Sequence, residues 1–224
     1  MTDALDETAV TDVLSETERP LRADARRNRE RILESAREVF AEDGIDAQMD
    51  DVARRAQVGV GTVYRHFPTK EALMVELVRQ KFQLFAAGAR EALQRDEDPF
   101  AVFADMLRRN AGVCARDAAM QHALTGVGEH IWAQAQNEQD ELNTLSGELM
   151  ARAQQAGTMR SDVRPTDIAM LMCGVSATMA HKIPGLDWKR HLELAIDMLR
   201  ADPATSVGRT GAREHADLRA PPSA

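Results

Sequence analysis

The side chains best suited to chemistry lie in the segment 44–70, which reads GIDAQMDDVARRAQVGVGTVYRHFPTK. Tyr64, Arg65 and His66 are consecutive there, and Lys70 follows four residues after His66. Phenol, guanidinium, imidazole and ammonium groups all form hydrogen bonds with phosphate oxygens. These residue types therefore predict a surface that binds a nucleic-acid backbone.

Two short helices are needed to present these side chains. Apolar spacing predicts the first over about 49–56, with its inward face at Met49, Val52, Ala53 and Ala56. The second covers 61–67, and Pro68 ends it because a residue before proline avoids helical angles. Gly59 and Gly61 permit a tight turn between the two helices. The pattern is that of a helix-turn-helix, whose second helix enters the DNA major groove.

The second helix is too short to be stable alone, so it has to be held by the core. Val63 and Phe67, four residues apart, are expected to pin it. This leaves Thr62, Tyr64, Arg65 and His66 turned outward. Lys70, at the N-terminus of the following helix, is placed to hold a further phosphate.

Composition and charge set wider bounds. The chain has 224 residues, of which 44% are hydrophobic and 29% charged, as in a soluble globular protein. No apolar run approaches the ~20 residues of a membrane span, and the acidic N-terminus lacks a signal-peptide pattern. We therefore expect a cytoplasmic protein with no membrane partner. Its two cysteines, Cys114 and Cys173, are expected to remain thiols.

A net charge of −8 by itself disfavours DNA binding, but the distribution of the charge along the chain matters more. Residues 1–20 hold six acidic side chains and one arginine, whereas residues 21–31 hold five arginines and two acids. Screening limits the reach of a charge to ~8–10 Å, so a basic patch on an acidic protein still attracts phosphate.

Helical spacing continues through the rest of the chain, and no stretch alternates as a strand does. We predict an all-α fold of about nine helices. The predicted helices cover about 24–43, 49–56, 61–67, 70–87, 99–115, 117–135, 138–156, 165–182 and 188–201. Thr69 is the expected N-cap of the fourth. The acidic tail 1–21 and the Pro/Gly/Ala-rich tail 202–224 are predicted to be disordered.

Three motifs in order resemble the tetracycline-repressor (TetR) family of bacterial transcription regulators. They are R-x-x-I-L-x-x-A-x-x-x-F-x-x-x-G from Arg29 to Gly44, M-D-D-V-A-R-R-A from Met49 to Ala56, and V-G-x-G-T-V-Y-R-H-F-P-T-K-E-A-L from Val58 to Leu73. The resemblance implies a helix-turn-helix DNA-binding domain at 22–68 and a helical effector-binding and dimerisation domain at 69–201. It also implies a homodimer.

By position, the resemblance and the basic segment together give the expected DNA-binding residues. They are Arg26, Arg27, Arg29, Gln48, Gly59, Gly61, Thr62, Tyr64, Arg65, His66 and Lys70. The chain departs from the family pattern at two of its positions. Gln48 stands where Thr, Ser or Pro is usual and is a poor N-cap. Gln57 stands where the turn usually has Gly, and a left-handed angle there costs a non-glycine residue about 1 kcal/mol.

In the C-terminal domain, sulfur-containing and isolated polar residues allow two interpretations. They are ordinary core, or they line a pocket for an apolar or aromatic effector. The candidate ligand residues are Met106, Asn110, Cys114, His122, Trp132, Met172, Cys173 and Met179. Their spacing does not suit a metal site, and we expect no metal and no cofactor. A thiol sensor remains open.

The stretch Ile168–Ala180 is almost entirely apolar or small, so it needs cover on most of its sides. We therefore predict a dimer interface on 167–182 and 188–200. The candidate interface residues are Ile168, Leu171, Val175, Met179, Leu192, Ala195 and Leu199.

The expected function is a non-enzymatic, DNA-binding transcriptional regulator. We expect a repressor that a small-molecule effector releases from a palindromic, double-stranded operator. Two alternatives remain. One is an activator or a global DNA binder. The other, of a different class, is a small-molecule-binding module with a non-functional head.

Overall fold

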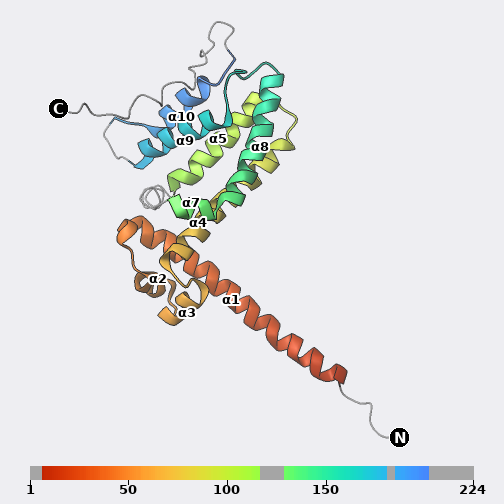
Figure 1. Ribbon diagram of the computed structural model, residues 1–224, viewed down its shortest axis with the longest axis vertical. Coiled ribbons are helices and arrows are strands. Elements are labelled where there is room, and N and C mark those ends of the chain that lie inside the picture. The colour runs from red at the N-terminus through yellow and green to blue at the C-terminus, as the bar shows by residue number, and fades with distance from the viewer. Residues whose placement is uncertain (1–6, 117–128, 181–184, 202–224) are drawn as a thin grey trace, which may run out of the picture.

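The computed structural model describes residues 7–116, 129–180 and 185–201, with the backbone alone for 7–22, 45 and 129. Within these residues the fold is all-α and elongated, with nine α-helices (Figure 1). The helices are α1 (Glu7–Asp43), α2 (Met49–Ala56), α3 (Val60–His66), α4 (Lys70–Leu93), α5 (Pro99–Arg116), α7 (Glu129–Gln134), α8 (Gln136–Gln155), α9 (Pro165–Ala180) and α10 (Trp188–Asp197). The predicted fold class is confirmed. The predicted C-terminal tail and part of the predicted helix 117–135 lie outside the described residues.

The first helix is much longer than predicted. α1 begins at Glu7 rather than near Asp24 and continues through Pro20. The prediction of a disordered tail is therefore wrong from Glu7 onward. The prediction rested on the acidity of the segment and on Pro20. The segment is nevertheless helical, because Ala, Leu and Glu in it are good helix formers. The first half of α1 projects away from the other helices (Figure 1).

The second half of α1 packs with α2, α3 and the first turns of α4 to form the head. Ile32 and Leu33 of α1, Val52 of α2 and Val63 of α3 are at most 1% exposed and meet in one cluster. Gly44 ends α1 with φ +63°, a left-handed angle that glycine adopts without strain. A 3-10 turn, η1 (Gly44–Asp46), then leads toward α2.

α4 connects the head to the body. Thr69 caps it as predicted, since the Thr69 hydroxyl accepts a hydrogen bond of 3.1 Å from the Ala72 backbone N–H. The helix runs to Leu93, beyond the predicted end near Ala87. Its last turns are held in the body, where Ala89 and Ala92 are buried.

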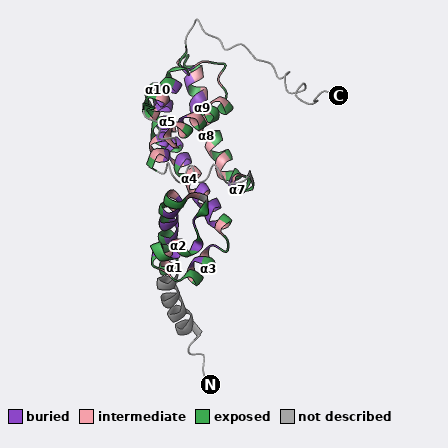
Figure 2. Ribbon diagram, turned by 90° about the vertical axis from the view of Figure 1, so that its left-hand side faces the viewer, coloured by how far each residue is buried: buried purple, intermediate pink, exposed green. Residues whose placement is uncertain are grey.

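The body consists of α4, α5, α8, α9 and α10 around a second apolar cluster (Figure 2). α8 lies along α4, and α5 packs against both α8 and α9. An isolated antiparallel bridge between Met159 and Arg200 joins the segment after α8 to the end of α10. None of the described helices is long and apolar enough to cross a membrane.

Most of the residues predicted for the dimer interface lie in the protomer's own core. Four of the predicted residues are at most 3% exposed because they fill the core between α5, α9 and α10; they are Val175, Leu192, Ala195 and Leu199. Ile168, Leu171 and Met179 are half-buried against the same core. The apolar pattern of α9 and α10 is thus used largely inside the protomer. Their outer face instead carries the exposed side chains of Met170, Leu194 and Met198.

Candidate DNA-binding surface and ligand cavity

The outer face of α3 carries the side chains predicted to meet DNA. Val63 and Phe67, at 0% and 3% exposed, hold the helix on the head core. Tyr64, at 46% exposed, and Arg65 point outward, while Thr62 and His66 are half-buried. Gly59 and Gly61 are exposed at the start of the helix and leave room for a close approach. Local packing therefore orients α3 with its polar face to solvent.

A hollow on the head surface lies between the N-termini of α2 and α4. It brings together predicted residues from three elements, namely Gln48, Tyr64 and Lys70. Lys70 is the first residue of α4, directly after the Thr69 cap, and its ammonium lies 5.8 Å from the centroid of the Phe40 ring of α1. A phenol, an ammonium and a helix N-terminus form a set suited to a phosphate.

Acidic side chains restrict where a phosphate is able to sit. Asp50 and Asp51 line the same hollow, and Asp51 is paired with Arg54. The Glu71 carboxylate accepts a hydrogen bond from the Glu71 backbone N–H and a further one from the Thr69 hydroxyl. These hydrogen bonds lower the pKa of Glu71. That carboxylate therefore stays ionised in the first turn of α4. An anion is favoured on the Lys70 side of the hollow, away from the α2 carboxylates.

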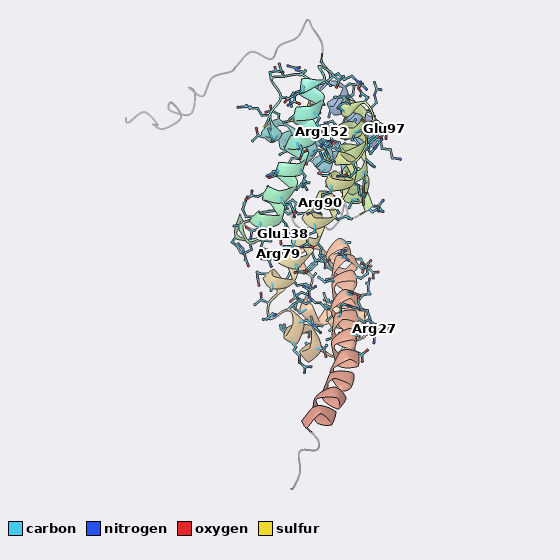
Figure 3. The ribbon with its side chains drawn as sticks, turned by 90° about the vertical axis from the view of Figure 1, so that its right-hand side faces the viewer. Arg27, Arg79, Arg90, Glu97, Glu138 and Arg152 are labelled. Atoms are coloured by element: carbon cyan, nitrogen blue, oxygen red, sulfur yellow. The ribbon has the colours of Figure 1, made fainter. Side chains whose placement is uncertain are left out.

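The three predicted arginines of α1 differ in how firmly they are held. Arg26 lies 3.9 Å from Glu30, and Arg27, labelled in Figure 3, is paired with Asp24; all four side chains are at least 60% exposed. Exposed pairs of this kind are weak and rearrange readily. Arg29 is held more tightly, because it contacts both an acidic side chain and an aromatic ring.

The Arg29 guanidinium lies 2.9 Å from a Glu76 carboxylate oxygen and 5.2 Å from the centroid of the Phe67 ring. It thus joins α1, the end of α3 and α4. The structure places Arg29 inside the head's own contacts, whereas Arg26 and Arg27 are available at the surface.

Two further arginines fix the helix-turn-helix, and the sequence did not identify them as structural. Arg31 donates a hydrogen bond of 2.5 Å to the Ala56 carbonyl, one of the free carbonyls at the end of α2. Arg55 binds Glu38 at 2.9 Å and Glu42 at 2.5 Å, joining α2 to α1. The hydrogen bond from Arg55 lowers the pKa of the Glu42 carboxyl. From the sequence, Arg31 and Arg55 are not distinguishable from solvent-exposed arginines, because their partners are distant in sequence.

The two positions that depart from the family pattern have distinct environments. Gln48 is the N-cap of α2 but makes no side-chain cap; its amide instead donates a 2.5 Å hydrogen bond to the Asp46 carbonyl and remains exposed. Gln57 adopts the left-handed conformation expected there, with φ 54° and ψ 44°. It is the one non-glycine residue with positive φ among those the structure describes.

The body contains a cavity of about 390 Å³ between α4, α5, α8 and α9. Its walls include the rings of Phe82, Phe85, Phe103 and Trp132. The volume is within the range of small-molecule binding sites. In contrast, the hollows on the head are open surface features.

This cavity gathers six of the eight predicted ligand residues, namely Met106, Asn110, Cys114, Trp132, Met172 and Cys173. Met179 does not line it and packs on the body core. His122 lies outside the described residues. Both cysteines are free thiols, Cys114 buried and Cys173 exposed. The described residues contain no cluster of three or more potential metal ligands.

Several wall residues were not predicted. Val78, Phe82 and Phe85 recur at four- and three-residue intervals along α4, and Gly147 faces them from α8. That spacing revealed an apolar helix face. It carried no information on whether the face meets another helix or an empty space.

The cavity and the head share side chains. Val78 belongs to the head core, and Phe82 and Trp132 pack against it, yet all three also line the cavity. The Phe82 and Trp132 rings have centroids 6.2 Å apart. Ile131 and Ala135, on either side of Trp132, are buried in the head cluster. A change in the position of Trp132 in the cavity would therefore alter the packing of the head core.

Arg79 of α4 also makes contacts where the head meets the body. Its guanidinium donates hydrogen bonds of 2.8 and 3.2 Å to the Gln134 carbonyl at the end of α7, and it lies 3.8 Å from Glu138 on α8. Figure 3 shows Arg79 and Glu138 next to each other where head and body meet. On the head side, Gln80 accepts a hydrogen bond of 2.6 Å from Arg37 of α1. One turn of α4 thus contacts both regions.

Comparison with known families gives two matches. Residues 32–77 match the model for bacterial regulatory proteins of the tetR family. Residues 98–201 match the model for the C-terminal domain of SbtR-like transcriptional regulators. The boundary between the matches falls within the connecting segment that includes α4.

Individual proteins are similar over most of the chain. The transcriptional repressor KstR of Mycolicibacterium smegmatis is 29% identical over 192 residues, which cover 84% of this chain and 93% of KstR. A TetR transcription regulatory protein from Mycobacterium vanbaalenii, solved by crystallography, is 35% identical, with a TM-score of 0.57 over 81% of this chain and 99% of that one. FadR from Bacillus subtilis, solved with stearoyl-CoA, has the same fold, with 19% identity and a TM-score of 0.60 over 75% of this chain and 97% of its own.

Proposed function

The chain belongs to the TetR family of bacterial transcription regulators, and we propose that it is a homodimeric repressor released from its operator when a small molecule fills the body cavity. The observation that carries this proposal is the dual position of α4. Its first residue, Lys70, lines the hollow at the DNA-binding surface, and its middle turns line the cavity.

The proposed DNA contacts are of two kinds, namely contacts with phosphates that position the head and contacts with base edges that read the sequence. Tyr64, His66 and Lys70 contact phosphates, and Arg26 and Arg27 add backbone contacts. Gln48 and Thr62 lie nearest the groove, where amide and hydroxyl groups read base edges. Arg29 acts by holding α3 and α4 in register, because its guanidinium is engaged with Glu76 and Phe67.

Release follows from linkage between the two sites. A ligand that binds the cavity better when the head is turned away from its operator position lowers operator affinity by that difference in free energy. Phe82 and Trp132 are the side chains through which this difference is exerted, because they touch both the cavity and the head core. The stearoyl-CoA complex of FadR supports the proposal that a regulator of this fold holds a small molecule.

The dimer uses the outer face of α9 and α10, the two helices predicted from the sequence, but through side chains other than the predicted ones. Met170 of α9, Leu194 of α10 and Met198 at the C-cap of α10 are 67%, 49% and 56% exposed, respectively. Large apolar side chains gathered on one face mark an association surface. Two heads related by a two-fold axis then read two half-sites of a palindrome.

Selection of bound sequences from a random duplex pool tests the DNA proposal. We expect one palindromic motif with half-sites about one helical turn apart or slightly more. Small molecules are then screened for release of the selected duplex by fluorescence anisotropy. Enrichment of no motif would contradict an operator-specific regulator and would favour a global DNA binder.

A matched pair of surface substitutions tests the dimer. Leu194→Arg places a charge on the proposed interface and is expected to give monomers with at least tenfold weaker operator binding. Leu84→Arg changes the same residue type on α4, where Leu84 is 44% exposed, and is expected to leave the dimer intact. Sedimentation velocity separates the outcomes, and an intact Leu194→Arg dimer would contradict this interface.

A further inference from the structure

We propose that the cavity takes an uncharged, mainly apolar effector that carries one hydrogen-bonding group directed at Asn110. The inference rests on the proposed function and specifies the ligand class for the same site. It depends on three features of the cavity, which are an amide that lines it without a hydrogen bond to the described residues, the scarcity of charge on the walls and a wall position that is open to a side chain.

Asn110 is the buried polar group of the cavity. It lies on α5, is 9% exposed and lines the cavity between Met106 and Cys114. Its side-chain amide makes no hydrogen bond with the residues that the structure describes, and its nitrogen and oxygen remain accessible, because no fully enclosed side-chain nitrogen or oxygen among those residues lacks a partner. The amide is therefore free to pair with a polar group of a ligand in place of water. An amide offers both a donor and an acceptor, so it suits a neutral carbonyl, hydroxyl or amine.

The surrounding walls are unsuited to a buried anion. Of the described lining residues, Lys81 alone is charged, and its ammonium lies 5.9 Å from the centroid of the Phe85 ring. Lys81 is half-exposed, so its charge remains partly hydrated. Most of the remaining wall is apolar and includes four aromatic rings and three thioethers, and the other polar wall residues, Gln139, Asn143, Ser146 and Ser176, are uncharged. Moving a carboxylate, sulfonate or phosphate into these surroundings costs far more than moving a neutral molecule.

The first experiment uses two fluorescent probes that differ by one sulfonate. N-phenyl-1-naphthylamine is neutral and apolar and carries one N–H, and 8-anilino-1-naphthalenesulfonate adds a sulfonate to the same rings. Both brighten on leaving water. The wild-type protein is expected to bind the neutral probe at one site per chain and the sulfonate at least tenfold more weakly. Equal or tighter binding of the sulfonate would overturn the proposal, as would no binding of the neutral probe.

A matched pair of asparagine variants tests the hydrogen-bonding group. Asn110→Leu removes the amide at similar size and is expected to weaken binding of the neutral probe about fivefold, the effect of one neutral hydrogen bond. Asn137→Leu makes the same change on α8 at an exposed position outside the cavity and is expected to leave binding unchanged. Unchanged or tighter binding by Asn110→Leu would overturn the assignment of Asn110.

A second matched pair establishes that the probe occupies this cavity. Gly147 lines the cavity on α8, and a Cβ added there meets no atom within 4 Å. Gly147→Leu is therefore expected to fill part of the cavity without strain and to reduce probe binding at least tenfold. Gly112→Leu on α5 also adds a Cβ in open space but lies outside the cavity walls, so it serves as the control. Full probe binding by Gly147→Leu would contradict the location.

Operator binding, measured in the same variants, separates failure of this inference from failure of the proposed function. If the neutral probe binds as described but never alters operator affinity, the release mechanism is wrong and the ligand class stands. If an anionic compound binds in the cavity and releases the operator, the release mechanism stands and the ligand class is wrong.

Discussion

In the head, apolar side chains of α1, α2, α3 and early α4 close on one another, whereas in the body those of α4, α5, α8 and α9 stand apart around a cavity of about 390 Å³. Both regions contain buried residues, which are purple in Figure 2, and these include Phe40 and Phe67 in the head and Phe100 and Phe103 in the body. The difference lies in what surrounds each side chain. A closed core holds α3 at a fixed orientation, and an open one leaves space for a ligand.

The same substitution in both regions measures this difference. Leu73 is 0% exposed in the head core, and Leu107 is 5% exposed on the cavity wall. Leu73→Ala is expected to lower the free energy of unfolding by about 4 kcal/mol, and Leu107→Ala by about 2 kcal/mol, because Leu107 already lacks neighbours on one side. Urea denaturation measures both values. Equal losses would mean that the body core is as closed as the head.

Loss of the phosphate contacts affects DNA binding and leaves both cores untouched. Tyr64→Ala combined with Lys70→Ala is expected to reduce operator affinity about 100-fold, or about 2.7 kcal/mol, since two charge-assisted or polar contacts are lost. Fluorescence anisotropy with the selected operator gives the affinity. Probe binding in the cavity serves as the control and should not change. Operator affinity within threefold of wild type would disprove the contact assignment.

The strained turn of the head offers a stabilising change. Gln57→Gly is expected to raise the free energy of unfolding by about 0.5–1 kcal/mol, because glycine adopts φ 54° without a Cβ clash. Gln94→Gly is the matched control at the C-cap of α4, where φ is −86°, and is expected to be destabilising. Thermal unfolding ranks the two variants. A destabilised Gln57→Gly would mean that its side chain has a role beyond the turn.

The smallest expected effect on stability concerns the ion pair between α5 and α10. Arg108 binds Glu193 through two hydrogen bonds of 2.8 and 2.7 Å, and these lower the pKa of the Glu193 carboxyl. A lowered folded pKa stabilises the fold above the unfolded pKa of about 4.3, and this contribution is lost as pH falls through the folded value. Glu193→Gln should therefore cost about 0.5 kcal/mol at pH 7, given the exposure of the pair, and progressively less below about pH 4.

Urea denaturation at pH 7 and at pH 3 measures this difference. Glu148→Gln removes an ion pair within α8 rather than between helices and should have a smaller effect. A Glu193→Gln cost that stays constant over this range would show that the carboxylate charge is not the cause.

The head was largely predictable because its constraints are local in sequence. The ends of α2 at Met49 and Ala56 and the cap at Thr69 follow from nearby residues, and the left-handed angle at Gln57 follows from the resemblance to the family pattern. The pairing of Arg55 with Glu38 and Glu42 could not be predicted in this way, because it depends on how α1 and α2 cross.

The body was predictable in helix type but less so in the use of each face. Six of the candidate ligand residues do meet around one cavity. However, the apolar face of α9 and α10 was assigned to a partner subunit, whereas Val175 and Leu192 are buried within the protomer. A hydrophobic helix face shows that cover is required, and the sequence does not say whether the same chain supplies it.

The shared position of Phe82 and Trp132 has a consequence for protein engineering. The head cluster includes Leu73 and Val78 from α4 and Ile131 and Ala135 from the segment around α7, so it does not end at Pro68. A chimeric biosensor that joins this head to another sensing module at Pro68 would leave an apolar surface of the head without its cover. The transplantable unit is discontinuous, and it must include these two segments if the exchanged module is to control transcription.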